Sequence, residues 1–393
     1  MNRIMVVTTT RADYGILRPL LRRMSEEEFV LSIAVGGTHL SNSFGYTINE
    51  IEADGYGKVT KFNYLLEDTS PNGVAQSSGR ALAMFADLLQ KEIEDKKKPD
   101  IIVLLGDRYE MLSIAEAALI YRIPIAHLHG GEITEGAIDD SVRHAITKLS
   151  TIHFASNEEH RKRIIQLGEA PDRVFNVGAL GVEAIRNLDY MSKQDLGADL
   201  KMDFSKPYIL MTYHPETASK ESENSHSESD DLAQLLYAVE RLSDYDFIIT
   251  KANADSGGAE INRQLEEFAA KRDNVHLYDS LGSHRYLSVM KYAELVLGNS
   301  SSGIIEAPAL RVPTINIGDR QKGRMRADSV IDVKPDTEEI VRAVIDVIKK
   351  KNESEYDYNS PYGEGCTSQL ICSKLEELLK DPASLKNKSF YDL

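Results

Sequence analysis

Short apolar runs alternate with amphipathic stretches along almost the whole chain, and this alternation constrains the fold more than any other feature. Runs such as Arg3–Thr9, Ile101–Leu105 and Tyr208–Thr212 have the length of buried strands, and a stretch with helical apolar spacing follows each of them. Strands that alternate with helices of this length favour parallel βαβ units. The sequence therefore predicts an α/β protein built from doubly wound sheets.

The predicted elements form two series, separated by a polar stretch at Asp189–Lys206 that we interpret as the domain connection. A chain of 393 residues is too long for one compact core, so two domains are expected. We predict an N-terminal Rossmann-like domain at 1–187 and a C-terminal, nucleotide-binding one at 188–366. The helix Thr367–Leu379 is expected to return, so that 367–393 packs against the first domain. The two domains are expected to face each other across a cleft.

The expected strands and helices alternate along the whole chain. In such sheets ligands bind beyond the carboxyl ends of the strands, so the loops that follow strands are the places to search for function. The predicted strands are Arg3–Thr9, Val30–Val35, Ile101–Leu105, Ile125–His129, Ile152–Ala155, Val174–Val177, Tyr208–Thr212, Phe247–Thr250, Val275–Tyr278, Leu295–Leu297 and Thr314–Ile317. The predicted helices are Tyr14–Met24, Gly79–Lys97, Arg108–Tyr121, Ser141–Leu149, Glu158–Leu167, Asp231–Leu242, Ala259–Ala270, His284–Tyr292, a short one from Ser302, Glu338–Lys350 and Thr367–Leu379.

The composition excludes several classes of protein. With 46 basic and 62 acidic side chains the net charge is −16, which disfavours nucleic acid or anionic lipid as a partner. No apolar run approaches the roughly 20 residues of a membrane-spanning helix, and the N-terminus enters a strand at once, so we expect a cytoplasmic protein. The two cysteines, Cys366 and Cys372, cannot form a disulfide framework. An anionic small molecule can still bind where arginines and backbone dipoles gather.

Two loops after strands have the character of phosphate sites. Gly298–Glu306 combines small residues, three serines and a predicted helix N-terminus, which can hold a diphosphate without the lysine of a Walker loop. Glu306 lies one helical turn further on, where its carboxylate can accept from ribose hydroxyls. Thr8–Gly15 offers backbone N–H groups and the guanidinium of Arg11, although a surface ion pair is the simpler interpretation of that arginine. The G-x-G-x-x-G fingerprint is absent after the first strand, which argues against a dinucleotide.

Acidic and histidine side chains follow two adjacent predicted strands. Asp107 comes after Ile101–Leu105, and His127, His129 and Glu132 lie in and after the next strand. Alternation along a strand predicts that the two histidines point the same way. Asp139 opens the following helix, where helix capping is the alternative role. Asp107, Glu132 and Asp139 would form a crowded acidic cluster whose like charges raise one or more pKa values and separate acid from base. A metal site is the weaker interpretation, because His-x-His with distant acids is not specific.

Two further features belong to the second series. His214 ends the strand Tyr208–Thr212 within the motif YHPE, and we expect it to face the cleft from the second domain. Glu216–Asp231 is polar, serine-rich and acidic, which predicts a mobile surface loop, with a lid over the cleft as the alternative.

Taken together, these stretches resemble the UDP-N-acetylglucosamine 2-epimerase family, and more closely its hydrolysing branch from sialic acid biosynthesis. The matching segments extend from Arg11 to Arg324 and so span both predicted domains. The fold implied is the two-Rossmann-domain arrangement of GT-B glycosyltransferases. The segments are TRADYG, GDRYE, HLHGGE, IDDSVRHAITKLS, YHPET, GNSSSGIIEAP and INIGDRQKGR.

The resemblance implies that UDP-N-acetylglucosamine and water give N-acetylmannosamine and UDP. Anti elimination of UDP would produce a 2-acetamidoglucal, after which water adds to C1 and C2 is protonated from the other face. Each proton-transfer group would typically contribute ~10²–10⁴-fold. The leaving group is already activated, so no metal or redox cofactor is expected. The partner would be a nucleotide sugar, and the assembly a homodimer or homotetramer.

Site residues follow from the resemblance position by position. Asp107 and Asp139 match carboxylates with catalytic roles, and His214 matches a histidine that contacts the departing diphosphate. Leu281 matches, more loosely, a residue whose backbone meets uracil. The nucleotide-binding positions matched are Arg11, Arg108, Asn253, Ser300, Ser301, Glu306 and Arg320.

The sequence departs from the family pattern at two positions. Many relatives have glutamate where His129 stands, so that proton-transfer role passes to His129, to Glu132 or to neither. Gly15 replaces a serine that contacts nucleotide in some relatives. A UDP- or GDP-linked 2,4-diacetamido-trideoxy sugar, the precursor of legionaminic acid, is therefore an alternative substrate. A GT-B glycosyltransferase and a non-catalytic nucleotide-sugar sensor are the alternative functions.

Overall fold

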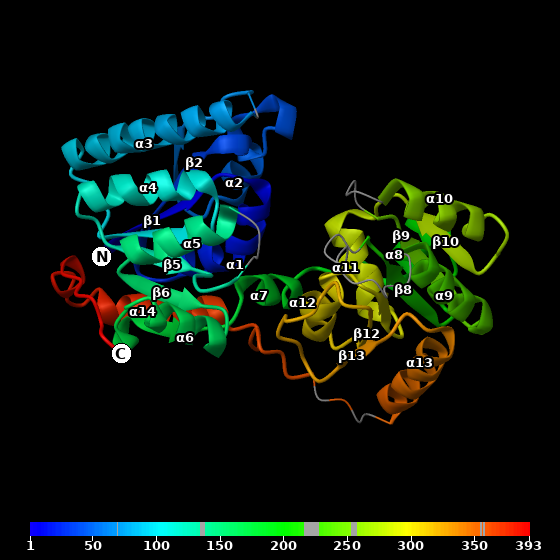
Figure 1. The fold of residues 1–393 in the computed structure, drawn as a ribbon. Coiled ribbons are helices and arrows are strands. Elements are labelled where there is room, and N and C mark those ends of the chain that lie inside the picture. The colour runs from blue at the N-terminus through cyan, green and yellow to red at the C-terminus, as the bar shows by residue number, and fades with distance from the viewer. Residues whose placement is uncertain (69, 134–137, 216–227, 253–257, 354–355, 357) are drawn as a thin grey trace. The chain divides into compact units, whose positions relative to one another are not determined.

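The chain folds into two α/β units, drawn as ribbons in Figure 1. Unit 1 comprises Met1–Ala184 together with Tyr362–Leu393, and unit 2 comprises Ile185–Pro361. These boundaries lie at 184/185 and 361/362, whereas the sequence analysis places them at 187/188 and 366/367. The computed structural model describes every residue except 69, 134–137, 216–227, 253–257, 354–355 and 357.

Unit 1 is built on a seven-stranded sheet in the order β3-β2-β1-β4-β5-β6-β7, in which every neighbouring pair is parallel. The order reverses between β1 and β4, and open α/β sheets bind ligands at such a switch point. The strands are β1 (Asn2–Thr8), β2 (Phe29–Gly36), β3 (Lys58–Phe62), β4 (Ile101–Leu105), β5 (Ile125–Leu128), β6 (Ile152–Ala155) and β7 (Val174–Asn176). The helices are α1 (Arg11–Glu26), α2 (Ile48–Asp54), α3 (Pro71–Glu94), α4 (Tyr109–Ile120), α5 (Ile138–Leu149), α6 (Glu158–Gln166), α7 (Leu180–Arg186), which runs into unit 2, and α14 (Thr367–Leu378).

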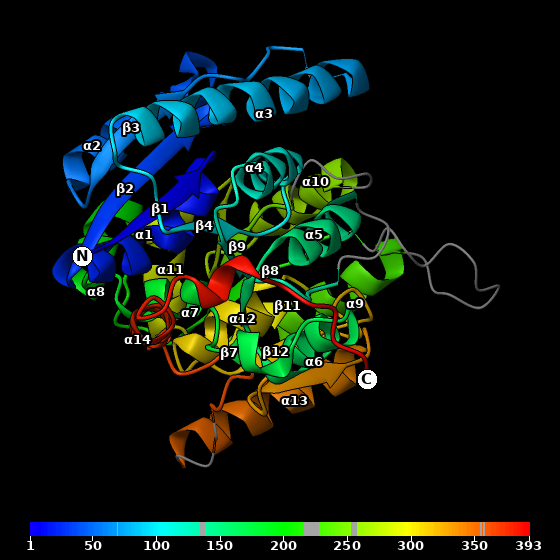
Figure 2. The same cartoon turned by 90° about the vertical axis from the view of Figure 1, so that its left-hand side faces the viewer.

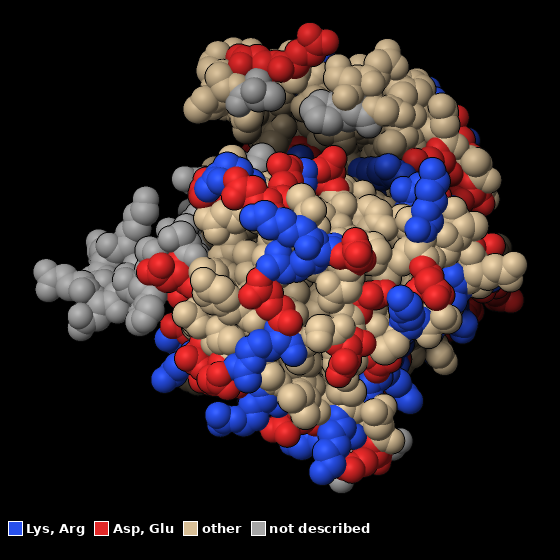
Figure 3. Space-filling view, turned by 90° about the vertical axis from the view of Figure 1, so that its right-hand side faces the viewer, with Lys and Arg blue, Asp and Glu red and all other residues tan. Residues whose placement is uncertain are grey.

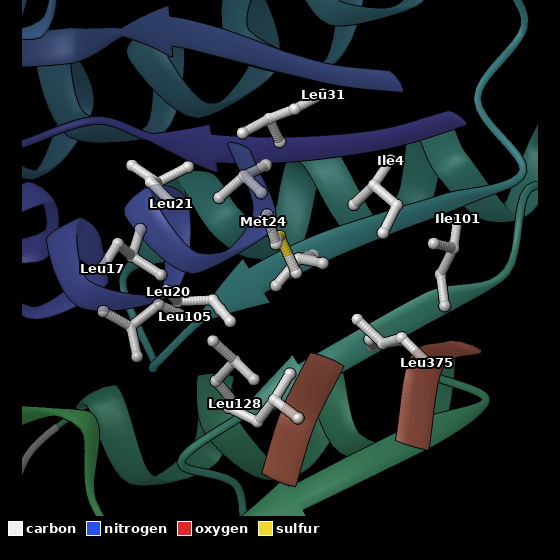
Figure 4. Packing of buried hydrophobic residues seen from close by; sticks show 14 of the residues in the cluster. Ile4, Leu17, Leu20, Leu21, Met24, Leu31, Ile101, Leu105, Leu128 and Leu375 are labelled. Atoms are coloured by element: carbon white, nitrogen blue, oxygen red, sulfur yellow. The ribbon is translucent and has the colours of Figure 1, made fainter. Parts of the chain in front are cut away.

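Helix α1 shows how the sequence produces this packing. Thr10 caps the helix, because its hydroxyl accepts from the backbone N–H of Asp13 at 3.2 Å. Apolar residues then recur every three or four positions, so one face of the helix is buried. Burying each leucine fully contributes about 1.5–3 kcal/mol. Figure 4 shows this face, Leu17, Leu20, Leu21 and Met24, near Ile4, Leu31, Ile101 and Leu105 of the strands.

Helices cover both faces of the unit 1 sheet. The core on one face includes side chains of α1, α2 and α14, and the core on the other includes side chains of α3, α4 and α5. Figures 1 and 2 show α3 beside α4 and α4 beside α5. Helix α14 packs beside α1 through Ile371 and Leu375, so a segment from the end of the chain completes the core around the first strand.

Unit 2 repeats the design with a six-stranded parallel sheet in the order β10-β9-β8-β11-β12-β13. Its switch point lies between β8 and β11, so the loops after these strands are the expected ligand positions. The strands are β8 (Tyr208–Thr212), β9 (Asp246–Thr250), β10 (Val275–Tyr278), β11 (Val296–Gly298), β12 (Thr314–Ile317) and β13 (Val330–Val333). The helices are α8 (Lys193–Leu200), α9 (Glu228–Arg241), α10 (Gly258–Ala269), α11 (Gly282–Tyr292), α12 (Ser302–Ala309) and α13 (Thr337–Asn352).

The predicted α/β class with two doubly wound sheets is confirmed, but several local predictions are wrong. The helix predicted at Gly79–Lys97 begins at Pro71, after the Ser70 cap, and ends at Glu94. The predicted connection Asp189–Lys206 contains helix α8, capped by the Ser192 hydroxyl, which accepts from the Asp195 N–H at 3.1 Å. The predicted strand Ile125–His129 ends one residue earlier, because His129 adopts a left-handed backbone with φ +62. Elements that the sequence analysis did not predict are α2, β3, α7 and β13.

Charges of both signs are interspersed on the face shown in Figure 3, where no continuous basic surface is visible. Within the described residues, no helix combines the length and the apolar character that crossing a membrane requires.

Candidate functional site

Loops at the carboxyl edge of the unit 1 sheet carry the polar side chains that the sequence singles out. Strands β4, β5 and β6 are neighbours, and each ends one or two residues before a polar side chain, at Asp107, His129 and Ser156. Parallel strands end at the same edge, so these residues gather in one region of unit 1.

Arg143 on α5 organises the first part of this region. Its guanidinium contacts the carboxylate of Asp107 and also donates to the backbone carbonyl of Glu132 at 2.9 Å and to Asp140 at 3.3 Å. Only 2% of Arg143 is exposed, so these bonds form in a largely desolvated place. Charge-assisted bonds of this kind are strong and directional. The arginine therefore ties the loops after β4 and β5 to α5.

His129 and Glu132 form a hydrogen-bonded pair in the loop after β5. His129 Nδ1 lies 2.9 Å from Oε1 of Glu132, and the Ser156 hydroxyl donates to the same oxygen at 3.0 Å. His129 holds its place because its backbone N–H donates to the carbonyl of Phe154 in β6. The ring nitrogen Nε2 is buried and has no hydrogen-bond partner among the described residues. An imidazole with one fixed and one unpartnered nitrogen suits proton transfer.

Glu132 is ionised in this region. Burial opposes its ionisation, but the hydrogen bond from His129 and the nearby His160 and Ser156 outweigh that effect and lower the pKa of Glu132 to about 2. Like charges in the acidic cluster were expected to raise one or more pKa values. Glu132 is not one of the groups with a raised pKa, because its nearest partners are histidines and a hydroxyl, so it stays a carboxylate.

His127 has other hydrogen-bond partners than His129 does, and they give it a structural role. It is completely buried, with Nε2 2.8 Å from the carbonyl of Gly106 and Nδ1 3.3 Å from the Thr147 hydroxyl. Burial lowers the pKa of His127 to about 3, so the ring is neutral. At His129 the backbone leaves the strand conformation, so the alternation of the strand does not extend to that residue.

Asp139 differs from the other acidic residues of this region. It lies half-buried in the first turn of α5, and the described residues provide neither a hydrogen bond nor an ion pair for its carboxylate. Among the described residues Asp139 caps no helix N–H group, which is the alternative role. A half-buried carboxylate with no partner in the described part of the chain can accept a hydrogen bond from a ligand.

Of the three arginines expected to bind nucleotide, Arg11 and Arg108 lie in unit 1, and their side chains differ in solvent exposure. Arg108 precedes α4, and its Nε donates to the buried carboxylate of Glu110 at 2.6 Å. Burial raises the pKa of Asp13, and this effect is larger than the opposite effect of the nearby guanidinium of Arg108, which lowers it. Arg11 is 74% exposed at its side chain and lies 3.5 Å from Glu50. In this structure Arg11 therefore forms a surface ion pair.

The loop after β11 in unit 2 brings its backbone close to the end of strand β8. Gly298 has φ +132, and a Cβ there would meet the carbonyl of Thr212 at 2.1 Å, so only glycine fits. Asn299 is fully buried and clamps the next strand end, because its side chain accepts from the His214 N–H at 2.7 Å and donates to the His214 carbonyl at 2.8 Å. Its own carbonyl accepts from Arg320 at 3.1 Å and from Gln321 at 2.8 Å.

Hydroxyl groups of Tyr286, Ser302 and Ser300 form a hydrogen-bonded chain at this loop. The Tyr286 hydroxyl lies 2.7 Å from the Ser302 hydroxyl, which donates to Ser300 at 3.1 Å. Ser301 precedes α12, whose N-terminus therefore opens at the loop. Glu306 lies on the same helix, and burial raises the pKa of its carboxyl group, for which the described residues provide no hydrogen bond. This set of hydroxyls, N–H groups and a carboxyl group suits a phosphorylated sugar with free hydroxyl groups.

The profile of the family described as UDP-N-acetylglucosamine 2-epimerase matches residues 22–376 of the chain. The chain belongs to the UDP-N-acetylglucosamine 2-epimerase family. Among its relatives, the GDP/UDP-N,N'-diacetylbacillosamine 2-epimerase (hydrolyzing) of Campylobacter jejuni is 43% identical over 84% of each chain. The polysialic acid biosynthesis protein P7 of Escherichia coli is 39% identical over 100% of this chain and 97% of the relative. The UDP-N,N'-diacetylbacillosamine 2-epimerase (hydrolyzing) of Legionella pneumophila is 34% identical over 99% of both. These relatives place the chain in the hydrolysing branch.

Solved structures of the family share the fold. The UDP-GlcNAc 2-epimerase from Neisseria meningitidis bound to UDP-GlcNAc aligns with a TM-score of 0.76 at 17% identity, over 95% of this chain and 100% of that one. The enzyme from Methanocaldococcus jannaschii aligns with a TM-score of 0.75 at 19% identity, over 95% and 99% of the two chains. The predicted GT-B-like class with two Rossmann-like units is thereby confirmed.

The positions carried over from the epimerase family are distributed over both units. Unit 1 brings Asp107, His129 and Glu132 together through Arg143 and Ser156, with Asp139 on α5. Unit 2 holds the loop 298–302 and, at the start of α11, the buried Leu281. Asn253 and residues 216–227 of the expected loop or lid lie outside the described residues.

Sequence reasoning missed Arg143, Ser156 and His160. Arg143 stands inside the quoted motif IDDSVRHAITKLS, and Ser156 directly follows the correctly predicted strand Ile152–Ala155. The rule that polar residues after a parallel strand face the ligand edge would have selected Ser156 as it selected Asp107.

Proposed function

We propose that this protein is a hydrolysing 2-epimerase that acts on a nucleotide-linked 2-acetamido sugar. Family membership and two relatives named as hydrolysing 2-epimerases, at 43% and 34% identity, support the reaction class. The single observation that carries the proposal is the pairing of His129 with Glu132 beside the Arg143–Asp107 ion pair. This arrangement puts a proton acceptor, carboxylates and a fixed cation at one edge of one sheet.

The reaction needs two proton transfers and one leaving group. In the first half, a base takes the C2 proton while the C2–H electron pair forms a C1–C2 double bond. The C1–O bond breaks with its electrons, so the nucleoside diphosphate departs and leaves a 2-acetamidoglucal. In the second half, water loses a proton as its oxygen bonds to C1, and an acid delivers a proton to the opposite face of C2. The products are the free 2-epimeric sugar and the nucleoside diphosphate.

Unit 1 supplies the proton-transfer groups in this proposal. His129 acts through Nε2, with the ionised Glu132 stabilising the imidazolium that forms. Asp107 and Asp139 are the carboxylates of the second proton transfer and of the water. Arg143 keeps Asp107 in place and balances its charge. Each proton-transfer group is expected to contribute ~10²–10⁴-fold.

Unit 2 supplies most of the proposed nucleotide-binding groups, and Arg11 and Arg108 of unit 1 supply the others. The N–H groups and hydroxyls at Ser300 and Ser301 bind the diphosphate, and Arg320 and His214 add charge or donors beside it. Glu306, whose carboxyl group has no partner among the described residues, accepts from the ribose hydroxyls. Arg11, Arg108, Asn253 and Leu281 complete the set of proposed contacts.

For the sugar, we propose a 2,4-diacetamido-trideoxyhexose linked to UDP or GDP, as in a legionaminic acid pathway. Two of the relatives are named for N,N'-diacetylbacillosamine, at 43% and 34% identity, which supports this choice. UDP-N-acetylglucosamine is the second candidate, supported by the UDP-N-acetylglucosamine 2-epimerase of Neisseria meningitidis at 30% identity over 100% of both chains. Sialic acid synthesis would be the corresponding pathway.

Product analysis in heavy water tests the proposal. The protein is incubated without an acceptor with UDP-N-acetylglucosamine, UDP-diacetylbacillosamine and GDP-diacetylbacillosamine, and products are followed by NMR. We expect a free, C2-inverted sugar with deuterium at C2, formed fastest from a diacetamido substrate. A product that retains its nucleotide would indicate the non-hydrolysing reaction instead. The absence of any product without an acceptor would favour a glycosyltransferase or a sensor.

A further inference from the structure

A chain of four polar side chains runs from the start of helix α6 to His129. It comprises Asn157, His160, Ser156 and Glu132, and each contact in it has only one consistent direction for its hydrogen. These directions can be derived in order, starting from a backbone N–H group whose role as donor is certain.

Asn157 fixes the first direction. It caps α6, and its Oδ1 accepts from the backbone N–H of His160 at 2.9 Å. A backbone N–H can only donate, so the side-chain atom that faces it is the amide oxygen. The other amide atom, Nδ2, is then a donor, and it lies 3.4 Å from Nε2 of His160. Nε2 of His160 must therefore accept.

The direction of the next hydrogen bond, between His160 and Ser156, follows from the protonation of the His160 ring. Burial lowers the pKa of His160, so the ring is neutral and carries one proton. Because Nε2 accepts, that proton is on Nδ1, which lies 2.8 Å from the Ser156 hydroxyl oxygen. His160 therefore donates to Ser156. The hydroxyl hydrogen of Ser156 remains free to donate to Glu132 Oε1 at 3.0 Å.

Glu132 completes the chain at His129. With its pKa lowered to about 2, Glu132 is a carboxylate and can only accept. Nδ1 of His129, 2.9 Å from Oε1, must then carry a hydrogen. A neutral His129 has no second ring proton, so its lone pair is on Nε2.

The surroundings of Nε2 indicate that this lone pair has a use. It is buried and has no partner among the described residues, and buried acceptors are rarely left without one. The backbone of His129 is also held in the left-handed region at φ +62, which a residue with a side chain seldom adopts. The neighbouring Gly131 makes room for α6, because a Cβ there would lie 2.4 Å from the His160 carbonyl.

From these contacts we infer that Ser156, Asn157 and His160 are positioning residues that hold the proton of neutral His129 on Nδ1 and make Nε2 its proton-accepting atom. The inference deepens the proposed function and rests on it for the kinetic part of the test. When Nε2 takes a proton, Nδ1–H stays bonded to Glu132, so the carboxylate stabilises the imidazolium without moving. A histidine base held in the wrong tautomer can lose up to ~10⁴-fold in kcat.

The tautomers can be measured without any substrate. Long-range ¹H–¹⁵N correlation spectra of the ¹⁵N-histidine-labelled full chain distinguish a protonated from an unprotonated ring nitrogen. His129→Gln and His160→Gln assign the two signals by their loss. We expect Nδ1–H on both neutral rings. A neutral wild-type His129 with its proton on Nε2 overturns the inference, whatever the protein catalyses.

Three variants test the positioning role. Asn157→Asp keeps an acceptor for the helix cap but cannot donate to His160, so the His160 proton should move to Nε2. Ser156→Ala removes the link to Glu132. Both should lower kcat about ten-fold or more with KM changed less than about two-fold. Glu158→Gln, at an exposed neighbour of Arg161, is the control and should change neither tautomers nor kcat.

The kinetic and spectroscopic results separate two failures. If the wild type shows the expected tautomers but turns over no nucleotide sugar, the proposed function fails and the hydrogen-bond chain stands. If the enzyme is active, and Asn157→Asp and Ser156→Ala keep wild-type kcat and an unchanged His160 tautomer, the positioning role is overturned.

Discussion

The guanidinium of Arg143 contacts the carboxylate of Asp107, although 36 residues separate them in the chain. Asp107 follows β4 and Arg143 lies on α5, so the ion pair joins two elements of unit 1 at the edge where the proposed chemistry occurs. The arginine is almost completely buried, and breaking a buried ion pair leaves an uncompensated charge. Its role therefore combines support of the fold with placement of Asp107.

The first prediction concerns the fork geometry of Arg143. Arg143→Lys keeps the charge but cannot serve Asp107, Asp140 and the Glu132 carbonyl together. We expect kcat to fall at least ten-fold and the free energy of unfolding to fall by about 1–3 kcal/mol. Arg22→Gln, which breaks an exposed pair with Glu26, is the control and should change stability by less than about 0.5 kcal/mol. Wild-type kcat in Arg143→Lys would remove the arginine from the site.

The second prediction separates chemistry from binding at Asp107. Asp107→Asn retains the shape of the side chain but cannot accept a proton, so kcat should fall by ~10²–10⁴-fold. UDP affinity, measured by calorimetry, should stay within about two-fold, because Asp107 is not one of the proposed nucleotide-binding groups, most of which belong to unit 2. Asp87→Asn, at an exposed position on α3, is the control. Near-normal turnover of Asp107→Asn would exclude Asp107 from proton transfer.

Sequence alone predicted the fold where hydrophobic pattern decides it. The strands Ile101–Leu105, Ile152–Ala155 and Thr314–Ile317 occur with the predicted bounds, because they are short segments with large apolar residues, buried on both faces. The hydrophobic pattern did not predict β3. Most residues of this strand are exposed or only partly buried, and the strand is therefore not an apolar run. The pattern also failed for α8, where one buried residue, Leu196, gives too little periodicity.

The chemistry of the site was less predictable than its location. The sequence placed Asp107, His129 and Glu132 after neighbouring strands, but not the partners that set their charges. Glu132 owes its low pKa to the hydrogen bond from His129 and partly to that from Ser156, which follows the neighbouring strand β6. The end of β5 at Leu128 depends on a left-handed backbone at His129, a conformation that is uncommon in any residue except glycine and that the hydrophobic pattern does not predict. Such features arise from tertiary contacts.

The third prediction concerns the loop after β11. Arg320 and Gln321 both donate to the carbonyl of Asn299, but only Arg320 brings a charge for a diphosphate. Arg320→Ala should weaken UDP binding about ten-fold or more, whereas Gln321→Met, which removes an uncharged donor, should weaken it less than about three-fold. Ser301→Ala should lie between the two. Equal UDP dissociation constants for wild type, Arg320→Ala and Ser301→Ala would contradict the proposed diphosphate site.

The last prediction concerns Glu169, which ties the end of the chain to α5. Its carboxylate contacts His153 at 3.0 Å, Lys148 at 2.6 Å and Lys388 at 2.7 Å, and Lys388 also donates to the Ser150 carbonyl at 2.6 Å. Burial opposes ionisation of Glu169, but bonds from His153, Lys148 and Lys388 outweigh it and lower the pKa to about 2.

A lowered carboxyl pKa has a definite consequence for stability. Above the ordinary value of about 4.5 both folded and unfolded states are ionised at this position, so the full stabilisation is present. As the pH falls from there toward 2, the unfolded state takes up the proton first, and the stabilisation is lost. Glu169→Gln should therefore lower the unfolding temperature at pH 7, and the difference from wild type should shrink as the pH approaches 3. Glu26→Gln, in an exposed pair, is the control and should show a small difference at every pH. If the difference in unfolding temperature between Glu169→Gln and wild type is constant between pH 7 and pH 3, the three partners do not lower the pKa of Glu169.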